Sequence, residues 1–282
     1  MQTYSSSTET AKFSSSLPLH KQESSTPPNR FAWISRWKAA LVHLSISACL
    51  ALAAVLLLYF VWYPQPFFEA SGAKPLLLLL VGVDVVLGPL ITLIIFNPKK
   101  KSLPFDLAVI AAIQLAALVY GMYTVFQARP VYVVYAQDRF EVVAANDLLP
   151  AELARVTREE FKSLPLLGPK LVGAVFPTDP EEKGRVLSAS FGEGGAIQAF
   201  PQHYVPIGYQ FKEVLEHGKP LADLIKRNRA REAEILKTIQ SLGYKTADLL
   251  FLPVRAKDRN FAALIDAKTG EVVGYALVDP SS

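Results

Sequence analysis

Asp84 is the residue of this chain whose type and position most clearly suggest chemistry. It stands near the middle of a 21-residue apolar stretch, Leu76–Phe96, and no other residue of this stretch is charged. A carboxylate inside an apolar membrane helix is costly unless it is neutralised or paired, so such groups are usually functional. Three roles fit: polar contacts that hold helices of this chain together, a docking point for another transmembrane helix, or an ion or proton site.

Four further residues accompany this carboxylate. Tyr120 lies at a similar depth on a later apolar stretch and is a candidate hydrogen-bond partner, and Gln114 lies about 9 Å deeper by the helix rise. Gly88-Pro89 interrupts the helix one turn after Asp84, because proline removes the hydrogen bond to the carbonyl of Val85. The interruption is either a binding notch or a feature of helix shape alone.

The other reactive residue types do not form a recognisable constellation. We expect His43, in the first apolar stretch, to point to the membrane interface; a carboxylate on a neighbouring helix is its alternative partner. His203 and His217 have no residues at metal-ligand spacing around them. Gly192–Gly195 lacks the lysine of a phosphate-binding loop and predicts a turn. The sequence therefore favours a non-catalytic protein with no cofactor and no metal.

Three apolar stretches are long enough to cross a membrane as helices. They cover about residues 37–62, 76–96 and 106–126, and about 20 apolar residues in a helix span the hydrocarbon core of a bilayer. A Ser/Thr-rich tail, residues 1–32, precedes them, and its composition predicts disorder. We expect a transmembrane domain of three helices at residues 33–128.

The distribution of charge predicts the orientation. Residues 1–129 carry 10 Lys/Arg and 5 Asp/Glu, whereas residues 130–282 carry 19 and 20. Basic residues gather before the first span and at Lys99–Lys101 after the second, and they mark the cytoplasmic side. We therefore expect a cytoplasmic N-terminus and a C-terminal domain outside, which is the periplasm in a Gram-negative bacterium. The nearly neutral C-terminal part argues against a nucleic-acid partner.

Residues 129–282 read as a soluble α+β domain. Asp179 followed by Pro180 predicts a helix start, and an apolar stripe over residues 221–242 predicts a helix that Gly243 closes. Strands followed by helices and then strands indicate a sheet with helices on one face. Runs of β-branched and aromatic residues predict the strands, at residues 131–136, 139–145, 249–254, 261–265 and 271–278.

A series of short motifs follows these elements along the chain. The membrane part contains Ser35-Arg-Trp-Lys38, Trp62-Tyr-Pro-Gln-Pro-Phe-Phe68, Gly82-Val-Asp-Val-Val-Leu-Gly-Pro89, Phe96-Asn-Pro-Lys-Lys-Lys-Ser102, Asp106-Leu107, Gln114-Leu115 and Tyr120-Gly121. The soluble part adds Ala128-Arg-Pro-Val131, Arg139-Phe-Glu-Val-Val143 and Tyr204-Val-Pro206. In this combination, over about residues 33–280, the chain resembles the TfpX/TfpZ family of type IV pilin accessory proteins; residues 1–30 depart from the family's pattern.

The resemblance implies a multi-pass inner-membrane protein that works with a major pilin. Its implied role is to support pilin levels or pilus assembly, and the family offers no established catalytic residue to transfer. The matching positions mark a fold and a candidate docking surface for pilin.

Two classes of function stay open at this stage. In the first, the chain is a pilin chaperone or assembly factor. Its small and polar span residues receive the pilin helix, and its soluble domain holds the pilin head, for example by adding a strand to a sheet edge. In the second, the chain is a small oligomeric channel, transporter or sensor in which Asp84 faces a water path. The sequence does not predict the oligomeric state. The candidate partner-binding residues are Asp84, Gly88, Pro89, Gln114 and Tyr120.

Overall fold

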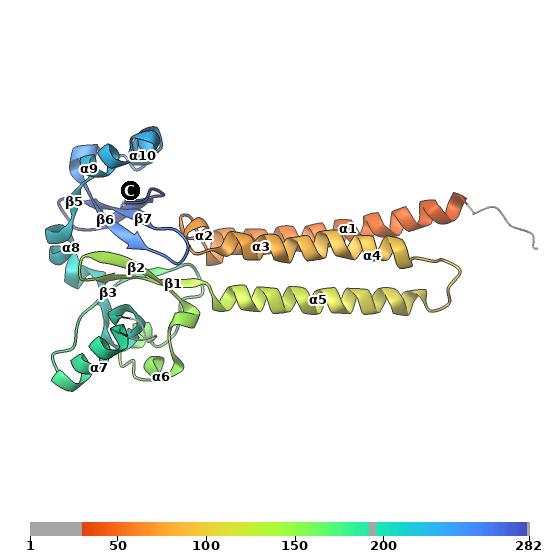
Figure 1. Ribbon diagram of the computed structural model, residues 1–282, viewed down its shortest axis with the longest axis horizontal. Coiled ribbons are helices and arrows are strands. Elements are labelled where there is room, and N and C mark those ends of the chain that lie inside the picture. The colour runs from red at the N-terminus through yellow and green to blue at the C-terminus, as the bar shows by residue number, and fades with distance from the viewer. Residues whose placement is uncertain (1–29, 192–195, 281–282) are drawn as a thin grey trace, which may run out of the picture.

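The computed structural model describes residues 30–191 and 196–280, and it shows a bundle of long helices joined at one end to a sheet domain (Figure 1). The expected Ser/Thr-rich tail falls almost wholly on residues 1–29. The expected turn at Gly192–Gly195 falls on residues 192–195. Both therefore lie outside the described residues.

Within the described ranges, three helical segments are long and apolar enough to cross a membrane: Ser35–Trp62, Ala73–Ile95 and Leu103–Gln127. The large apolar side chains on their outer faces are exposed, as expected for helices that lipid surrounds. The chain is thus a membrane protein. The segments are built from α1 (Arg30–Leu57) and η1 (Leu58–Trp62), from α3 (Ala73–Gly82), η2 (Val83–Leu87) and α4 (Gly88–Ile95), and from α5 (Leu103–Gln127).

The second span contains a widened turn. Its η2 segment is π-helical and includes Asp84, and Pro89 follows at the start of α4. Proline has no N–H for the preceding turn, and a π turn is one way in which a helix absorbs such an irregularity. The sequence predicted an interruption here but not its form.

A mixed sheet forms the centre of the C-terminal part, with eight strands among the described residues. The strands are β1 (Pro130–Ala136), β2 (Arg139–Ala144), β3 (Lys170–Ala174), β4 (Tyr204–Pro206), β5 (Lys219–Pro220), β6 (Leu249–Arg255), β7 (Phe261–Asp266) and β8 (Val272–Ala276). Their order is β4-β3-β1-β2-β6-β7-β8, and β5 pairs with β6. The pairs β1–β3 and β2–β6 are parallel, and the other pairs are antiparallel.

The five strands that the sequence predicted are confirmed as β1, β2, β6, β7 and β8. The short strands β3, β4 and β5 were not predicted. They are two to five residues long, which is too short for an alternating pattern to stand out.

Helices cover both faces of the sheet. The longer ones are α7 (Pro180–Ser190), α8 (Phe211–His217), α9 (Leu221–Arg227) and α10 (Glu232–Ser241). The short ones are α2 (Phe67–Ala70), η3 (Ala145–Asp147), α6 (Pro150–Leu153), η4 (Glu159–Phe161), η5 (Ile197–Ala199), η6 (Pro201–His203), η7 (Ile207–Gln210), η8 (Arg229–Arg231) and η9 (Thr246–Asp248).

The expectation that helices cover one face is met by α7, α9 and α10 but not by α8. Tyr132 and Val134 of β1 face the cluster of α7, whereas Val133 and Tyr135 face Val214 of α8. Successive residues of a strand point to opposite faces, so α8 lies on the other side. The sequence pattern did not predict α8, because this helix is only seven residues long.

Two helix predictions in this domain have different outcomes. The predicted start at Asp179 is confirmed, since its carboxylate accepts a 2.8 Å hydrogen bond from the backbone N–H of Glu182. The single helix expected over residues 221–242 is wrong: α9 and α10 are separated by Asn228, whose backbone is not helical, and by η8. Both helices still present their apolar side chains to β6, β7 and β8, which accounts for the continuous stripe.

The two parts of the molecule are tied together by the loop between the first two spans. The side chain of Phe67, only 4% exposed, enters the core of the sheet domain. Its ring lies 5.7 Å from that of Phe261 and 5.5 Å from that of Tyr275, centroid to centroid. At the base of the loop, the Tyr63 hydroxyl donates a 2.8 Å hydrogen bond to the carbonyl of Val125. The loop is therefore part of both cores.

Candidate functional site

Polar side chains from three spans meet inside the helix bundle. His43 and Ser47 of α1, Asp84 of η2 and Gln114 of α5 line one small cavity of about 90 Å³. Asp84 is 8% exposed and Ser47 is 6% exposed. A spacing of four residues places His43 and Ser47 on one face of α1, so their pairing in the cavity follows from helix geometry.

The face of the second span that carries Asp84 also carries Gly88 and Thr92, again at intervals of four residues. His43 and Thr92 are joined by a 2.6 Å hydrogen bond between Nδ1 and Oγ1, and Thr92 is 2% exposed. The expectation that His43 points to the membrane interface is therefore wrong. Within an apolar span, the imidazole reaches a hydroxyl on the neighbouring helix instead.

Gln114 packs directly against Gly88. A Cβ atom on Gly88 would lie 2.0 Å from Gln114 Nε2, so no larger residue fits while the amide keeps its place. Among the described residues, neither the Gln114 amide nor Asp84 Oδ1 has a hydrogen-bond partner, and these atoms are buried. A buried polar group without a partner costs free energy, so these atoms lack a compensating interaction within the described residues.

A larger, mostly apolar groove begins at Asp84 and follows α3 and α5. Its volume is about 240 Å³, and its lining residues are Leu76, Leu79, Leu80, Val83, Asp84, Ala117, Leu118, Tyr120, Gly121, Thr124 and Val125. The side chain of Tyr120 is 73% exposed. It lies along the groove and forms no hydrogen bond to Asp84, so the candidate pairing of these two residues is not present.

A third cavity lies at the opposite end of the bundle from the sheet domain. It has a volume of about 570 Å³, and Lys38, His43, Thr92 and Phe96 are among its lining residues. His43 lines this cavity and the small one, and Asp84 lines the small one and the groove. The three cavities thus follow one another along the bundle, with an ionisable residue at each junction.

The structure therefore brings together part of the predicted set. Asp84, Gly88 and Gln114 meet at one point, Pro89 follows the π turn, and Tyr120 lies farther along the groove. Sequence analysis missed Ser47. The signal that could have found it is its spacing of four residues from His43, which repeats the spacing on the second span.

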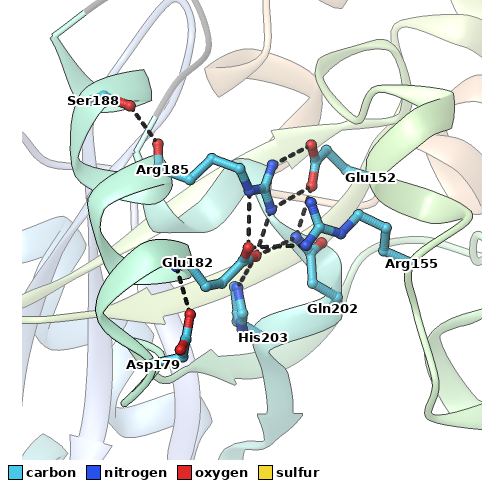
Figure 2. Close-up of polar contacts among 8 residues, drawn as sticks. All are labelled: Glu152, Arg155, Asp179, Glu182, Arg185, Ser188, Gln202 and His203. Atoms are coloured by element: carbon cyan, nitrogen blue, oxygen red, sulfur yellow. Dashed lines mark hydrogen bonds and ion pairs between the residues drawn. The ribbon is translucent and has the colours of Figure 1, made fainter.

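A second polar cluster lies in the sheet domain and joins α6, α7 and η6 (Figure 2). Arg185 donates to both oxygens of Glu152, at 2.6 and 3.1 Å, and to both oxygens of Glu182, at 2.5 and 2.9 Å. His203 Nε2 lies 3.0 Å from Glu182, and Gln202 donates to Glu152 at 2.7 Å. The residues come from segments far apart in the sequence, which is why no local pattern predicted the cluster.

The charges in this cluster are held in their ionised forms. Hydrogen bonds from Arg185 hold the pKa of Glu182 well below its usual range. Burial raises the pKa of Glu152, but the hydrogen bonds from Arg185 and Gln202 outweigh it and the net shift is downward. The hydrogen bonds to Glu182 and Glu152 raise the pKa of Arg185. Arg155 also donates to Glu182 at 2.9 Å, so two guanidinium groups face two carboxylates and the cluster fixes three segments together. No group of three or more possible metal ligands occurs in the described part of the chain.

Comparison with known proteins connects this architecture to one family. Residues 31–72, which hold the first span and the loop with Phe67, match the fimbrial assembly protein FimB family. Two fimbrial assembly proteins of Dichelobacter nodosus, of serogroups E1 and I, are 32% and 31% identical to the chain over 229 residues, covering 80% of it and 88% of each relative. A third, of serogroups C1 and C2, is 38% identical over 127 residues, covering 44% of the chain and 97% of that relative.

No solved structure matches the chain. The similarity to the first two relatives extends over nearly their whole length, across both the spans and the sheet domain. We conclude that the chain belongs to the fimbrial assembly protein family.

Proposed function

We propose that this protein is a TfpX/TfpZ-type accessory protein that binds a type IV pilin within the inner membrane and supports its stability or assembly without catalysing a reaction. Membership of the fimbrial assembly protein family supports a role in pilus assembly. The observation that carries the proposal is the position of Asp84. Its buried Oδ1 has no partner among the described residues, and it stands at the end of an apolar groove between two spans.

The groove has the chemistry of a site for one apolar helix. Leu79 and Tyr120 on its walls are 68% and 73% exposed, and a carboxylate at its end would pair with a donor group carried by that helix. Close packing and polar contacts are the forces that associate helices in lipid. A pilin before assembly is a single-span protein with a head outside the membrane, so it would present such a helix beside the groove.

The proposed orientation places the N-terminus in the cytoplasm and the sheet domain in the periplasm. It is supported by the basic residues before the first span and after the second. In this orientation the groove lies beside the membrane segment of pilin, and the sheet domain lies on the same side as its head.

Site-directed photocrosslinking in membranes tests this proposal. A photoreactive residue at Leu79, which lines the groove, is compared with one at Ile113, which is 65% exposed on α5 and does not line the groove. With the cognate pilin co-expressed, a pilin adduct is expected at position 79 and not at position 113. Equal adducts at the two positions, or none together with unchanged pilin levels after deletion of this protein, would overturn the proposal.

A second candidate function is an oligomeric channel, transporter or sensor. The observation that favours it is that His43 and Asp84 each line two neighbouring cavities, because ionisable groups spaced along a membrane bundle can relay protons. Proton flux into liposomes containing the purified protein, compared between the natural chain and Asp84→Asn, tests it. Flux that Asp84→Asn abolishes would support this function, and the absence of any flux above empty liposomes would exclude a proton channel or transporter.

A further inference from the structure

The loop of residues 162–169, between η4 and β3, carries two large apolar side chains that the protein does not cover. Leu166 is 62% exposed and Leu167 is 79% exposed. The flanks of the loop are fixed, since Phe161 is 4% exposed and Leu164 packs against the same core cluster. The exposed pair is therefore presented by an anchored turn rather than by a free segment.

The loop is attached to the ends of two membrane spans. The N–H of Gly168 donates a 2.8 Å hydrogen bond to the carbonyl of Val61, one residue before the first span ends at Trp62. The guanidinium of Arg129, two residues beyond the end of the third span at Gln127, donates to the carbonyl of Pro165 at 3.3 and 3.1 Å. The exposed leucines thus lie between two backbone contacts at the level where the spans leave the membrane.

Both contacts fix the position of the loop relative to the ends of the first and third spans. Gly168 has φ +58°, and a Cβ on it would lie 3.1 Å from Cγ of Pro64, so the backbone is close against the end of the first span. Arg129 is 4% exposed and its guanidinium carbon lies 3.7 Å above the ring of Phe126. Such stacking uses the planar guanidinium and would not be reproduced by lysine.

The aromatic residues at this level match those expected at a membrane interface. The rings of Trp62 and Phe126 lie 4.9 Å apart, centroid to centroid, at the ends of the first and third spans. Tryptophan is enriched where hydrocarbon meets the headgroups. Lys170, after the leucines, is exposed and suits the phosphate groups of lipids. Lys162, before them, is also exposed, but its ammonium is paired with Glu159 at 2.5 Å.

We propose that Leu166 and Leu167 insert into the lipid leaflet on the side of the sheet domain. The loop is then a membrane contact additional to the three spans, and it holds the sheet domain at a set height and rotation above the bilayer. The occupant is lipid because the loop is continuous with the ends of the spans, where lipid surrounds the chain. This inference concerns the purified protein in a bilayer and does not depend on pilin binding.

A fluorescent label on the loop tests the proposal. In a Cys49→Ala background, which removes the thiol exposed on α1, a polarity-sensitive dye is attached to Leu167→Cys and, as a matched control, to Tyr209→Cys. Tyr209 is 73% exposed and lies in η7, just before α8, which is at the end of the domain away from the spans (Figure 1). Both proteins are placed in nanodiscs of phosphatidylcholine and phosphatidylglycerol, one chain per disc.

The dye at position 167 is expected to emit at shorter wavelength than the dye at position 209. It should be quenched several-fold more strongly by lipids with a spin label near the headgroup, and less by iodide in the water. Equal quenching by iodide at the two positions would overturn the proposal. Protection of position 167 that appears only with two chains per disc would also overturn it, because the occupant would then be a second copy.

Discussion

Gly88 of the second span and Gln114 of the third touch at a point that has no room for a side chain on the glycine. A Cβ there would lie 2.0 Å from Gln114 Nε2 and 2.8 Å from Cδ. This contact sets how closely α5 approaches α4 beside the carboxylate of Asp84. It also places the buried amide of Gln114 at the small cavity that Asp84 lines.

Replacement of Gly88 by alanine is expected to displace the Gln114 amide and to lower the free energy of unfolding by about 1 kcal/mol. This is the low end of the cost of overpacking, because the atoms in the way belong to the end of a flexible side chain. The matched control is Gly82→Ala on the same span, where a Cβ would meet no atom within 4 Å. Unfolding in mixed detergent micelles measures both. Because the clash is with Gln114, the double variant Gly88→Ala/Gln114→Ala should recover most of the loss; equal stabilities of Gly88→Ala and Gly82→Ala would contradict the packing described here.

Loss of the Thr92 hydroxyl should weaken the contact between the first two spans. Thr92→Val keeps the shape but removes the hydrogen bond to His43, and hydrogen bonds between membrane helices average about 0.6 kcal/mol. Thr92→Ser keeps the hydroxyl and serves as the control. The side-chain resonances of His43 by nuclear magnetic resonance should shift in Thr92→Val and stay close to their natural positions in Thr92→Ser; shifts of the same size in both variants would argue against the bond.

Truncation of Phe67 should destabilise the sheet domain although the residue belongs to the loop between two spans. Its ring is buried against Phe261 and Tyr275, and Phe→Ala changes in a core cost about 3–5 kcal/mol. Phe60→Ala, at a span position that is 68% exposed, is the control. Urea unfolding followed by far-ultraviolet circular dichroism should show a lower midpoint for the transition of the sheet domain in Phe67→Ala alone. An unchanged midpoint would mean that the two parts are not coupled through this ring.

The cluster around Glu182 predicts a specific response to acid. Arg185 lowers the pKa of Glu182 below its ordinary value of 4.5. Because the folded pKa lies below the unfolded one, the stability from this group is complete above about pH 4.5 and is lost as the pH falls further. Glu182→Gln should therefore be less stable than the natural chain near pH 7, and the difference should shrink in acid.

Thermal unfolding in detergent, followed by circular dichroism at several pH values, measures this difference. Glu181→Gln on the same helix is the control, since Glu181 is exposed and should leave the pH dependence unchanged. A constant difference between Glu182→Gln and the natural chain across the acid range would show that Glu182 contributes through packing and not through its charge.

Much of the architecture is encoded locally. The three spans follow from the length and apolarity of their stretches, because about 20 apolar residues in a row cross a bilayer as a helix that satisfies its own backbone hydrogen bonds. The strands β1, β2, β6, β7 and β8 follow from runs of β-branched and aromatic residues. Asp84 stands out because a carboxylate in such a stretch is costly wherever the helix packs.

Contacts between distant segments were not encoded in any local pattern. Which helix His43 faces depends on how α1 packs against α4, and the entry of Phe67 into the sheet core depends on the loop folding over β7 and β8. The Glu182 cluster likewise needs three segments that lie up to 50 residues apart. Hydropathy and residue spacing indicate which face of a helix or strand will be buried. Which other element packs against that face depends on side-chain packing and hydrogen bonding between elements. These interactions exist only once the chain has folded.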